Sequence, residues 1–326
     1  MAKKRILSGM RPTGKLHLGH YVGALENWVK LQYEYESFHL IADYHVLTTN
    51  PDSSEIYQNT LEMVMDWLAT GLNPEVAPIF RQSQIKEHAE LFLIFSMLIT
   101  KARLERNPTL KDQVRDLNIE HVIYGHLGYP VLQSADILLY KGEVVPVGED
   151  QVPHIEITRE IARRFNNQYG KVFPEPEPLL TKFSRLPGLD GQAKMSKSLG
   201  NTILLSDSAD EVQNKIRKAV TDPQKVRRND PGHPEVCTIF TYHKRFNPEE
   251  IPEIEASCRS GELGCVDCKL KCTAKINEFL EPIRTKRAEY ENNLDLVKDV
   301  LSEGEKKAKK VAKQTMSEVH EKMKLG

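Results

Sequence analysis

Two short segments of this chain carry side chains suited to phosphate chemistry. Residues 194–198 read Lys-Met-Ser-Lys-Ser and offer two ammonium groups and two hydroxyls. They follow residues 186–191, which are too rich in glycine and proline for a helix or strand, so we expect a mobile loop. Lysine is a compact charge on a flexible stem, able to follow phosphates whose geometry changes during a reaction. Taken alone, such a run would more often be a solvated basic loop.

The second segment, residues 12–20, lies near the N-terminus and contains His17 and His20. Gly14 and Gly19 flank an expected turn between a strand and a helix, where backbone N–H groups can face an anion. Two imidazoles three positions apart can donate hydrogen bonds to phosphate oxygens on which charge develops. A metal-ligand pair and ordinary helix-start residues are the alternatives, and this motif alone would also fit other nucleotidyl transferases. Both segments together favour nucleotide chemistry.

The composition of the 326 residues is ordinary for a soluble protein, with 28% charged residues, 40% hydrophobic residues and a net charge of −1. A near-neutral chain does not suit a protein that coats nucleic acid indiscriminately. No segment is typical of a signal peptide, and no apolar run approaches the length of a membrane span. We expect a cytoplasmic protein that does not enter the membrane.

Expected strands and helices alternate through the first 205 residues. Short apolar runs predict buried strands, and apolar residues at helical spacing predict the helices between them. This alternation indicates a parallel sheet with right-handed crossovers. We therefore predict an α/β fold over residues 1–205, a doubly wound, Rossmann-like nucleotide-binding domain. The expected strands are residues 5–8, 38–42, 77–80 and 143–147, and the expected helices are residues 19–33, 55–70, 87–100, 130–140 and 151–165.

From residue 206 onward the apolar positions follow helical spacing and no convincing strand is found. We predict a helical domain over residues 206–293 and one or two amphipathic C-terminal helices over residues 294–326, interrupted near Gly304. A lysine run between Lys306 and Lys313 falls mainly on the face opposite the apolar one. A solvated face is favoured over an RNA contact for that run.

At these residues the chain resembles the class I aminoacyl-tRNA synthetases, whose two signature sequences are similar to residues 17–20 and 194–198. A third string at residues 145–151, Val-Pro-Val-Gly-Glu-Asp-Gln, resembles the tryptophanyl branch rather than the tyrosyl branch. The resemblance implies a tryptophan–tRNA ligase. L-tryptophan would react with ATP, accompanied by Mg²⁺, to give tryptophanyl-AMP and pyrophosphate, and the acyl group would pass to tRNA(Trp). The resemblance also implies a homodimer.

The resemblance assigns catalytic roles to four side chains. His17 and His20 would face the α-phosphate, and Lys194 and Lys197 would neutralise the leaving pyrophosphate. No side chain needs to act as a nucleophile, because the carboxylate of the amino acid attacks, so that catalysis is positioning and charge stabilisation. The residues expected to line the ATP site are Arg11, Pro12, Thr13, Gly19, His20, Gly148, Glu149, Asp150, Leu186, Lys194, Met195, Ser196, Lys197 and Ser198.

Asp136 falls in an apolar helical pattern, with Leu132 and Leu139 as its neighbours at minus four and plus three. A carboxylate buried there without a partner would cost several kcal/mol, so a partner is required. An arginine or a backbone donor would satisfy it structurally. The resemblance instead places Asp136 where the family accepts a hydrogen bond from the indole N–H of tryptophan. Such an acceptor discriminates well, because an analogue without the donor leaves the acid unpaired.

Further side chains are expected around the amino acid. Asp150 and Gln151 follow a strand and a glycine turn, where they could accept from an α-ammonium group or ribose hydroxyls, or simply cap a helix. Gln133 and Leu7 stand where relatives carry Met and Phe, which changes the polarity of the rim. Apolar core packing is an equal expectation for the valines. The residues expected at tryptophan are Asp136, Gln151, Tyr129, His45, Gln133, Val145 and Val147.

All five cysteines lie between Cys237 and Cys272, and an odd number crowded into one region is not a disulfide framework. The two-residue spacing of Cys265 and Cys268 lets both thiolates point at one ion and favours zinc. Four thiolates would also suit an iron–sulfur cluster. Resemblance to some bacterial tryptophanyl enzymes favours a structural four-iron four-sulfur cluster, with Cys272 left out. The predicted ligands are Cys237, Cys258, Cys265 and Cys268.

Overall fold

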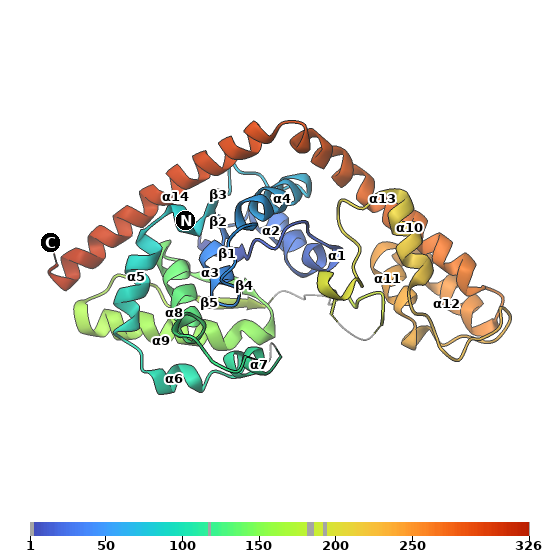
Figure 1. The fold of residues 1–326 in the computed structure, drawn as a ribbon, viewed down its shortest axis with the longest axis horizontal. Coiled ribbons are helices and arrows are strands. Elements are labelled where there is room, and N and C mark those ends of the chain that lie inside the picture. Colours follow the sequence, from blue (N-terminus) through green and yellow to red (C-terminus); the bar gives the residue numbers. More distant parts are fainter. Residues whose placement is uncertain (1–2, 117–118, 181–185, 192–193, 326) are drawn as a thin grey trace.

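The computed structural model describes residues 3–116, 119–180, 186–191 and 194–325. In these ranges five parallel strands form one sheet with the order β3-β2-β1-β4-β5 (Figure 1). The order reverses between β1 and β4, as in doubly wound nucleotide-binding sheets, so the predicted α/β fold is confirmed. The strands are β1 (Arg5–Met10), β2 (Glu36–Ile41), β3 (Ile79–Arg81), β4 (Val144–Val147) and β5 (Glu177–Leu180).

Strand β5 was not expected from the sequence. Its four residues, Glu-Pro-Leu-Leu, contain Pro178, and none of them is buried. A proline cannot donate to a strand ladder and is tolerated at the edge of a sheet. Because β5 is an edge strand that pairs only with β4 among the described strands, its sequence lacks the continuous apolar run typical of a buried parallel strand.

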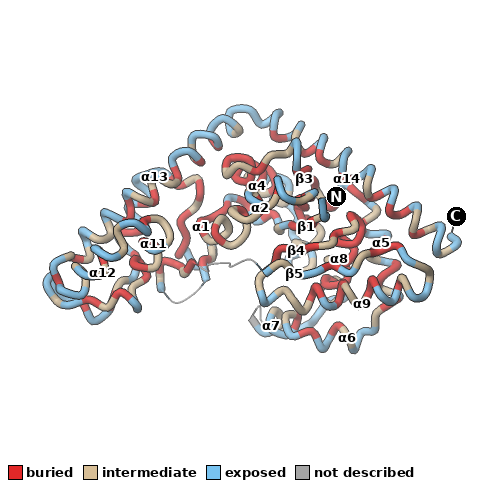
Figure 2. Tube along the Cα trace, turned by 180° about the vertical axis from the view of Figure 1, so that it is seen from behind, coloured by how far each residue is buried: buried red, intermediate tan, exposed pale blue. Residues whose placement is uncertain are grey.

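Helices cover both faces of the sheet and enclose two apolar cores, one among α5, α8 and α9 and one among α2, α4 and the helical region that follows. Figure 2 shows the buried segments gathered at the sheet and on the helix faces turned toward it. The helix α8 begins earlier than predicted and contains Pro130, which sequence reasoning takes as a helix start. The helices up to residue 169 are α1 (Leu18–His20), α2 (Glu26–Leu31), α3 (Asp43–Leu47), α4 (Ile56–Ala69), α5 (Glu87–Ser96), α6 (Lys101–Glu105), α7 (Pro108–Asp116), α8 (Tyr124–Leu139) and α9 (Val152–Tyr169).

After β5 the described elements are all helical, as expected from residue 206 onward. Side chains of this helical region, including Ile216 and Ile276, share one apolar core with Leu18 of the sheet-containing part. The predicted boundaries at residues 205 and 293 stay predictions. No helix in the described part of the chain is both long and apolar enough to span a bilayer. The helices here are α10 (Ala209–Lys218), α11 (Thr238–Phe246), α12 (Ile251–Ser260) and α13 (Cys265–Glu291).

The C-terminal segment forms a single helix, α14 (Leu294–Met323), so the predicted interruption at Gly304 is wrong. A Cβ atom on Gly304 would lie 1.9 Å from the carbonyl oxygen of Ile79, so the glycine lets α14 lie directly on the edge strand β3. Beside this contact Arg81 donates to Glu305 at 2.6 Å. Helices α13 and α14 form an arch over both parts of the molecule (Figure 1), and α14 covers a strand edge that would otherwise be open to pairing.

Candidate active site

The structure brings the two predicted segments together outside the carboxyl end of β1. The Lys197 ammonium donates to the carbonyl oxygens of Thr13 and Lys15, at 3.0 Å from the latter. The chain beyond the second segment then runs along the first, and the N–H of Leu18 donates to the carbonyl of Ile203 at 2.9 Å. Two stretches far apart in sequence are thus held together by backbone contacts and one lysine.

Two glycines allow this close approach. Gly14 has a φ of +82°, in the left-handed region that favours glycine. A Cβ atom on Gly19 would lie 2.9 Å from His17 Nδ1 and 3.3 Å from Met195 Sδ. The buried Met195 therefore packs directly against the start of α1, so a side chain at position 19 would push the second segment away from the histidines.

His17 and His20 lie at the start of α1 with ring centroids 3.7 Å apart. The His17 N–H donates to His20 Nδ1 at 3.3 Å, so a neutral His20 carries its hydrogen on Nε2 and can donate from there. Burial, followed by the charges of Lys197 and Lys194, lowers the pKa of His17 to about 4. Burial, followed by His17 and the same lysines, lowers the pKa of His20 to about 3. At neutral pH the imidazoles are neutral donors.

The second segment is held by Asn201, which sequence reasoning missed. Its Oδ1 accepts from the Ser196 N–H at 2.8 Å, and its Nδ2 donates to Asp190 Oδ2 at 2.9 Å. The hydroxyls of Ser196 and Ser198 lie 2.8 Å apart, and Leu186 is buried beside this loop in the same core as Met195. Lys194 is exposed. An asparagine three residues past the signature carried no chemical signal of its own.

A second wall is formed where β4 ends, across the reversal of strand order from β1. Gly148 precedes a single turn at Glu149–Gln151, and Gln151 accepts from His154 Nδ1 at 3.1 Å. His154 Nε2 in turn accepts from the Tyr129 hydroxyl at 2.7 Å. Burial first, and then the nearby His45, lower the pKa of His154 to about 4, so this ring is neutral. Tyr129 and Gln151, both predicted, are therefore connected through a histidine that sequence reasoning missed.

Asp136 is buried on α8 and receives three side-chain hydrogen bonds. His88 Nδ1 and Gln82 Nε2 each donate to Oδ1 at 2.7 Å, and His45 Nε2 donates to Oδ2 at 2.9 Å. Two imidazoles and an amide, not the arginine or backbone donor of the alternative, are therefore its partners within the chain. His45 was predicted, whereas Gln82 and His88 were missed. Gln82 directly follows β3, and a polar residue at the carboxyl end of a parallel strand is a usable signal.

Burial acts to raise the pKa of Asp136, but the hydrogen bonds from His45 and His88 prevail and lower it to about 2. The carboxylate is therefore ionised and only accepts. A carboxylate has about four acceptor positions, and three are used, so Oδ2 retains one. The rings of His45 and Tyr129 lie 6.4 Å apart on this side.

The remaining predicted tryptophan residues lie on the same two elements. Gln133 is half-buried on α8, and Val145 and Val147 lie on β4. Both valines belong to the apolar core around α8 and α9, which agrees with the core packing that was considered for them. The predicted ATP residues Arg11, Pro12 and Thr13 directly follow β1.

The four predicted cysteine ligands line one small cavity in the helical region. Cys272 does not line it and is buried in the core instead. Among the described residues no group of three or more His, Cys, Asp or Glu side chains is placed to hold a metal ion. Burial first, and then the neighbouring thiols, raise the pKa of Cys268 to about 12. These thiols would need a bound cation to become thiolates.

Comparison with known proteins agrees with this geometry. The profile of the family described as tRNA synthetases class I (W and Y) matches residues 2–281. The tryptophan–tRNA ligase of Thermotoga maritima is 52% identical, covering 98% of this chain and 99% of that one. That of Aquifex aeolicus is 46% identical, covering 98% of this chain and all of that one.

Among solved structures, the tryptophanyl-tRNA synthetase of Campylobacter jejuni complexed with ADP and tryptophan superposes with a TM-score of 0.88 at 35% identity. The alignment covers 98% of this chain and 99% of that one. The profile and the relatives agree over nearly the whole length. The chain therefore belongs to the class I aminoacyl-tRNA synthetases, in their tryptophan–tRNA ligase branch.

Proposed function

We propose that this ligase activates L-tryptophan with ATP and transfers it to tRNA(Trp). The carboxylate of tryptophan attacks the α-phosphate, the bond to the bridging oxygen breaks, and pyrophosphate leaves with the negative charge. The terminal ribose of the tRNA then attacks the acyl carbon, and AMP leaves. One observation carries the proposal: Lys197 rests on the backbone of residues 13–15, beside the two histidines. Mg²⁺ enters with ATP as its phosphate chelate.

On the nucleotide side, the chain supplies neutral donors and separate cations. His20 offers Nε2–H to the α-phosphate, and its neutrality leaves Lys194 and Lys197 to balance the charge that develops on pyrophosphate. Lys197 has only carbonyl oxygens as partners among the described residues, so phosphate oxygens would be stronger acceptors for it. The residues after β1 and β4 would hold the remainder of ATP at the edge where parallel sheets bind nucleotides.

On the amino-acid side, the open acceptor position of Asp136 Oδ2 would receive the indole N–H. Tyr129, His45 and Gln133 would surround the ring, and Gln151 would accept from the α-ammonium group. Because Asp136 is ionised and already oriented by three donors, a ring that lacks the N–H leaves a buried charge incompletely paired. Selection would therefore come from the hydrogen bond more than from the size of the pocket.

Pyrophosphate exchange into ATP, measured separately with tryptophan and with tyrosine, tests this proposal. We expect exchange with tryptophan alone and charging of tRNA(Trp) by the same preparation. Exchange with tyrosine would contradict the role of Asp136. Absence of exchange with either amino acid would contradict the catalytic assignment.

We further propose that Cys237, Cys258, Cys265 and Cys268 hold a four-iron four-sulfur cluster, as in the iron–sulfur subgroup that the sequence resembles. Four thiols line one cavity, a donor set that suits an iron–sulfur cluster as well as zinc, and the family resemblance favours the cluster. The cluster would hold α11, α12 and α13 together on the side that meets tRNA. Metal and sulfide analysis of protein purified without oxygen tests this. Zinc without iron would contradict it.

The homodimer stays a prediction that rests on family resemblance, and analytical ultracentrifugation of the purified chain tests it. The cytoplasm, where translation takes place, is the compartment that this function requires.

A further inference from the structure

One backbone N–H of the first signature segment is bound by a buried carboxylate that lies outside the nucleotide site. Asp66 on α4 is completely buried, with Met63, Val64 and Trp67 buried around it. Its Oδ2 accepts from the Leu16 N–H at 2.6 Å. A buried carboxylate needs such partners, because an unpaired one is costly.

The second partner of Asp66 comes from the helical region. Arg287 on α13 is 2% exposed, and its guanidinium donates to Asp66 Oδ1 at 2.5 Å. The same group donates to the side chain and the carbonyl of Glu62 on α4, and to Glu291 on its own helix at 2.9 Å. One arginine therefore serves three carboxylates and ties α13 to α4.

The peptide unit between Lys15 and Leu16 connects this joint to the nucleotide site. Its carbonyl accepts from the Lys197 ammonium at 3.0 Å, and its N–H donates to Asp66 at 2.6 Å. The unit is planar and trans, so its two groups point in opposite directions and move together. The orientation that Asp66 imposes therefore decides where Lys197 can rest.

We infer that Arg287 and Asp66 are positioning residues that set Lys197 through the Lys15–Leu16 peptide, so that the helical region controls the geometry of pyrophosphate departure. The inference rests on the proposed role of Lys197. Neither Arg287 nor Asp66 belongs to the proposed ATP or tryptophan site. They transmit the position of α13 to the lysine.

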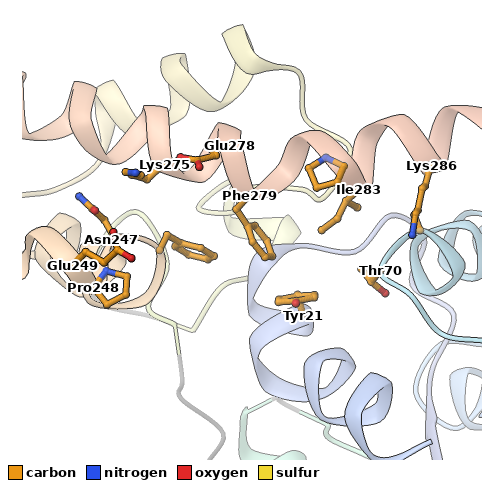
Figure 3. Close-up of a pocket in the computed structure, with 13 residues that line it drawn as sticks. Tyr21, Thr70, Asn247, Pro248, Glu249, Lys275, Glu278, Phe279, Ile283 and Lys286 are labelled. Atoms are coloured by element: carbon orange, nitrogen blue, oxygen red, sulfur yellow. Dashed lines mark hydrogen bonds and ion pairs between the residues drawn. The ribbon is translucent and has the colours of Figure 1, made fainter. Parts of the chain in front are cut away.

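The surroundings of the joint suit such transmission. An open groove separates part of α13 from the sheet-containing part (Figure 3). Thr70 and Lys286 line this groove, and the rings of Tyr21 and Phe279 meet in edge contact at 5.0 Å. The ion-paired joint begins one residue beyond Lys286. A shift of α13 across the groove would reach the Arg287 guanidinium directly.

A double-mutant cycle with Lys197 tests the inference. We expect Arg287→Met to lower kcat of pyrophosphate exchange on the order of 10- to 100-fold, because a small displacement of a charged group is enough for that loss. The KM for tryptophan should not change, because Asp136 lies in a different network. In a Lys197→Ala enzyme, Arg287→Met should slow exchange by less than about twofold, since coupled residues are not additive.

A matched control is available in Arg245, which also joins the helical region to a carboxylate of the sheet-containing part. It donates to Glu26 on α2 at 2.7 Å without contacting residues 13–17. Arg245→Met should leave kcat unchanged. Rates are expressed per active site by titration, so that loss of folded protein does not count. Arg287→Lys should restore part of the rate, because it keeps the charge but not the forked geometry.

Asp66→Asn is the second variant, in case Arg287→Met folds poorly. The amide oxygen can still accept from Leu16, but the negative charge is lost, and we expect a several-fold lower kcat that also disappears in the Lys197→Ala background. If either substitution lowers kcat equally with and without Lys197, the inference is overturned while the proposed role of Lys197 survives. If Lys197→Ala has the wild-type rate, both are overturned.

Discussion

The tryptophan pocket and the joint between α4 and α13 each contain a buried aspartate, but the two carboxylates titrate in opposite directions. Burial opposes the charge of both. At Asp136, hydrogen bonds from His45 and His88 outweigh burial and lower the pKa to about 2. At Asp66, burial outweighs Arg287 and the Leu16 amide and raises the pKa to about 6.

The difference lies in how the partners are shared. Asp136 receives three donors, and no second carboxylate hydrogen-bonds to those donors among the described residues. Asp66 shares its one cation with Glu62 and Glu291, and Lys197 lies near enough for its pKa to be affected by Asp66. The first arrangement keeps an acceptor permanently charged for recognition. The second leaves a charge poorly balanced, which suits a joint that must respond to movement.

The largest expected effect is that of Asp136→Asn. The substitution removes the charge and turns an amide N–H toward one of the existing donors or toward the indole. We expect kcat/KM for tryptophan to fall on the order of 1000-fold or more, as when a buried polar partner is lost from a recognition site. Pyrophosphate exchange at varied tryptophan and at varied ATP measures this, and the KM for ATP should change little. A loss confined to ATP would contradict the assignment.

His88→Phe should have the next largest effect. The ring is kept but the donor to Asp136 Oδ1 is removed, leaving Gln82 and His45 as partners. Loss of a hydrogen bond to a charged group costs about 1.5–3 kcal/mol, which corresponds to roughly 10- to 150-fold in kcat/KM for tryptophan. The pKa of Asp136 should rise, so the loss should be greater at pH 5 than at pH 8. An equal loss at both pH values would mean that His88 acts through packing alone.

Strands β1 to β4, the signature segments and Asp136 were predictable because each leaves a local pattern. An apolar run marks a buried strand, and an acid among leucines marks a polar group that needs a partner. The identity of that partner was not predictable, because Gln82 and His88 are distant in sequence and each is an ordinary residue in its own element. The assignment of tryptophan as the substrate came from the family resemblance alone.

The ion pair between Asp66 and Arg287 was even less predictable, because its two residues are still further apart in the sequence. Asp66 lies within an amphipathic helix and Arg287 within a charged one, and each alone indicates a solvated face. Only the fold brings positions 221 residues apart to hydrogen-bonding distance. At Gly304 the sequence predicted a break that the structure does not have. A glycine that permits close contact with Ile79 looks the same in the sequence as one that ends a helix.

The contributions of Asp136 and Asp66 to the free energy of unfolding should depend on pH in opposite directions. Asp136 has a lowered pKa, so its contribution to stability is present above its ordinary value of 3.8 and is lost as the pH falls toward 2. Asp66 has a raised pKa, so its contribution is present below 3.8 and is lost as the pH rises through about 6. Between pH 4 and 7, the free energy of unfolding of the wild type should therefore fall relative to that of Asp66→Asn.

Urea unfolding at several pH values measures both effects, with Asp136→Asn as the matched variant. The advantage of the wild type over Asp136→Asn should grow as the pH rises from 3 to 5. The facing charges at Asp66 are Arg287, Glu62, Glu291 and Lys197, and substitution of any of them would shift the window. If the wild type instead gained stability relative to Asp66→Asn between pH 4 and 7, Arg287 would fully offset the cost of burying the charged carboxylate.

The smallest expected effect is that of Tyr140→Phe at the far end of the Asp136 network. The Tyr140 hydroxyl donates to His88 Nε2 at 2.9 Å, so its loss removes one neutral hydrogen bond but keeps the ring packed on Phe38 and Phe80. We expect about 1 kcal/mol of lost stability and a change of no more than roughly fivefold in kcat/KM for tryptophan.

Tyr242→Phe is the matched control for that variant, because it also removes a buried tyrosine hydroxyl, one that donates to the Pro187 carbonyl at 2.7 Å. The control should lose similar stability while the KM for tryptophan stays the same. If both variants raise that KM equally, the hydroxyl of Tyr140 acts through general stability and the network ends at His88. If only Tyr140→Phe raises it, the orientation of Asp136 depends on a chain of contacts that reaches the core beneath the sheet.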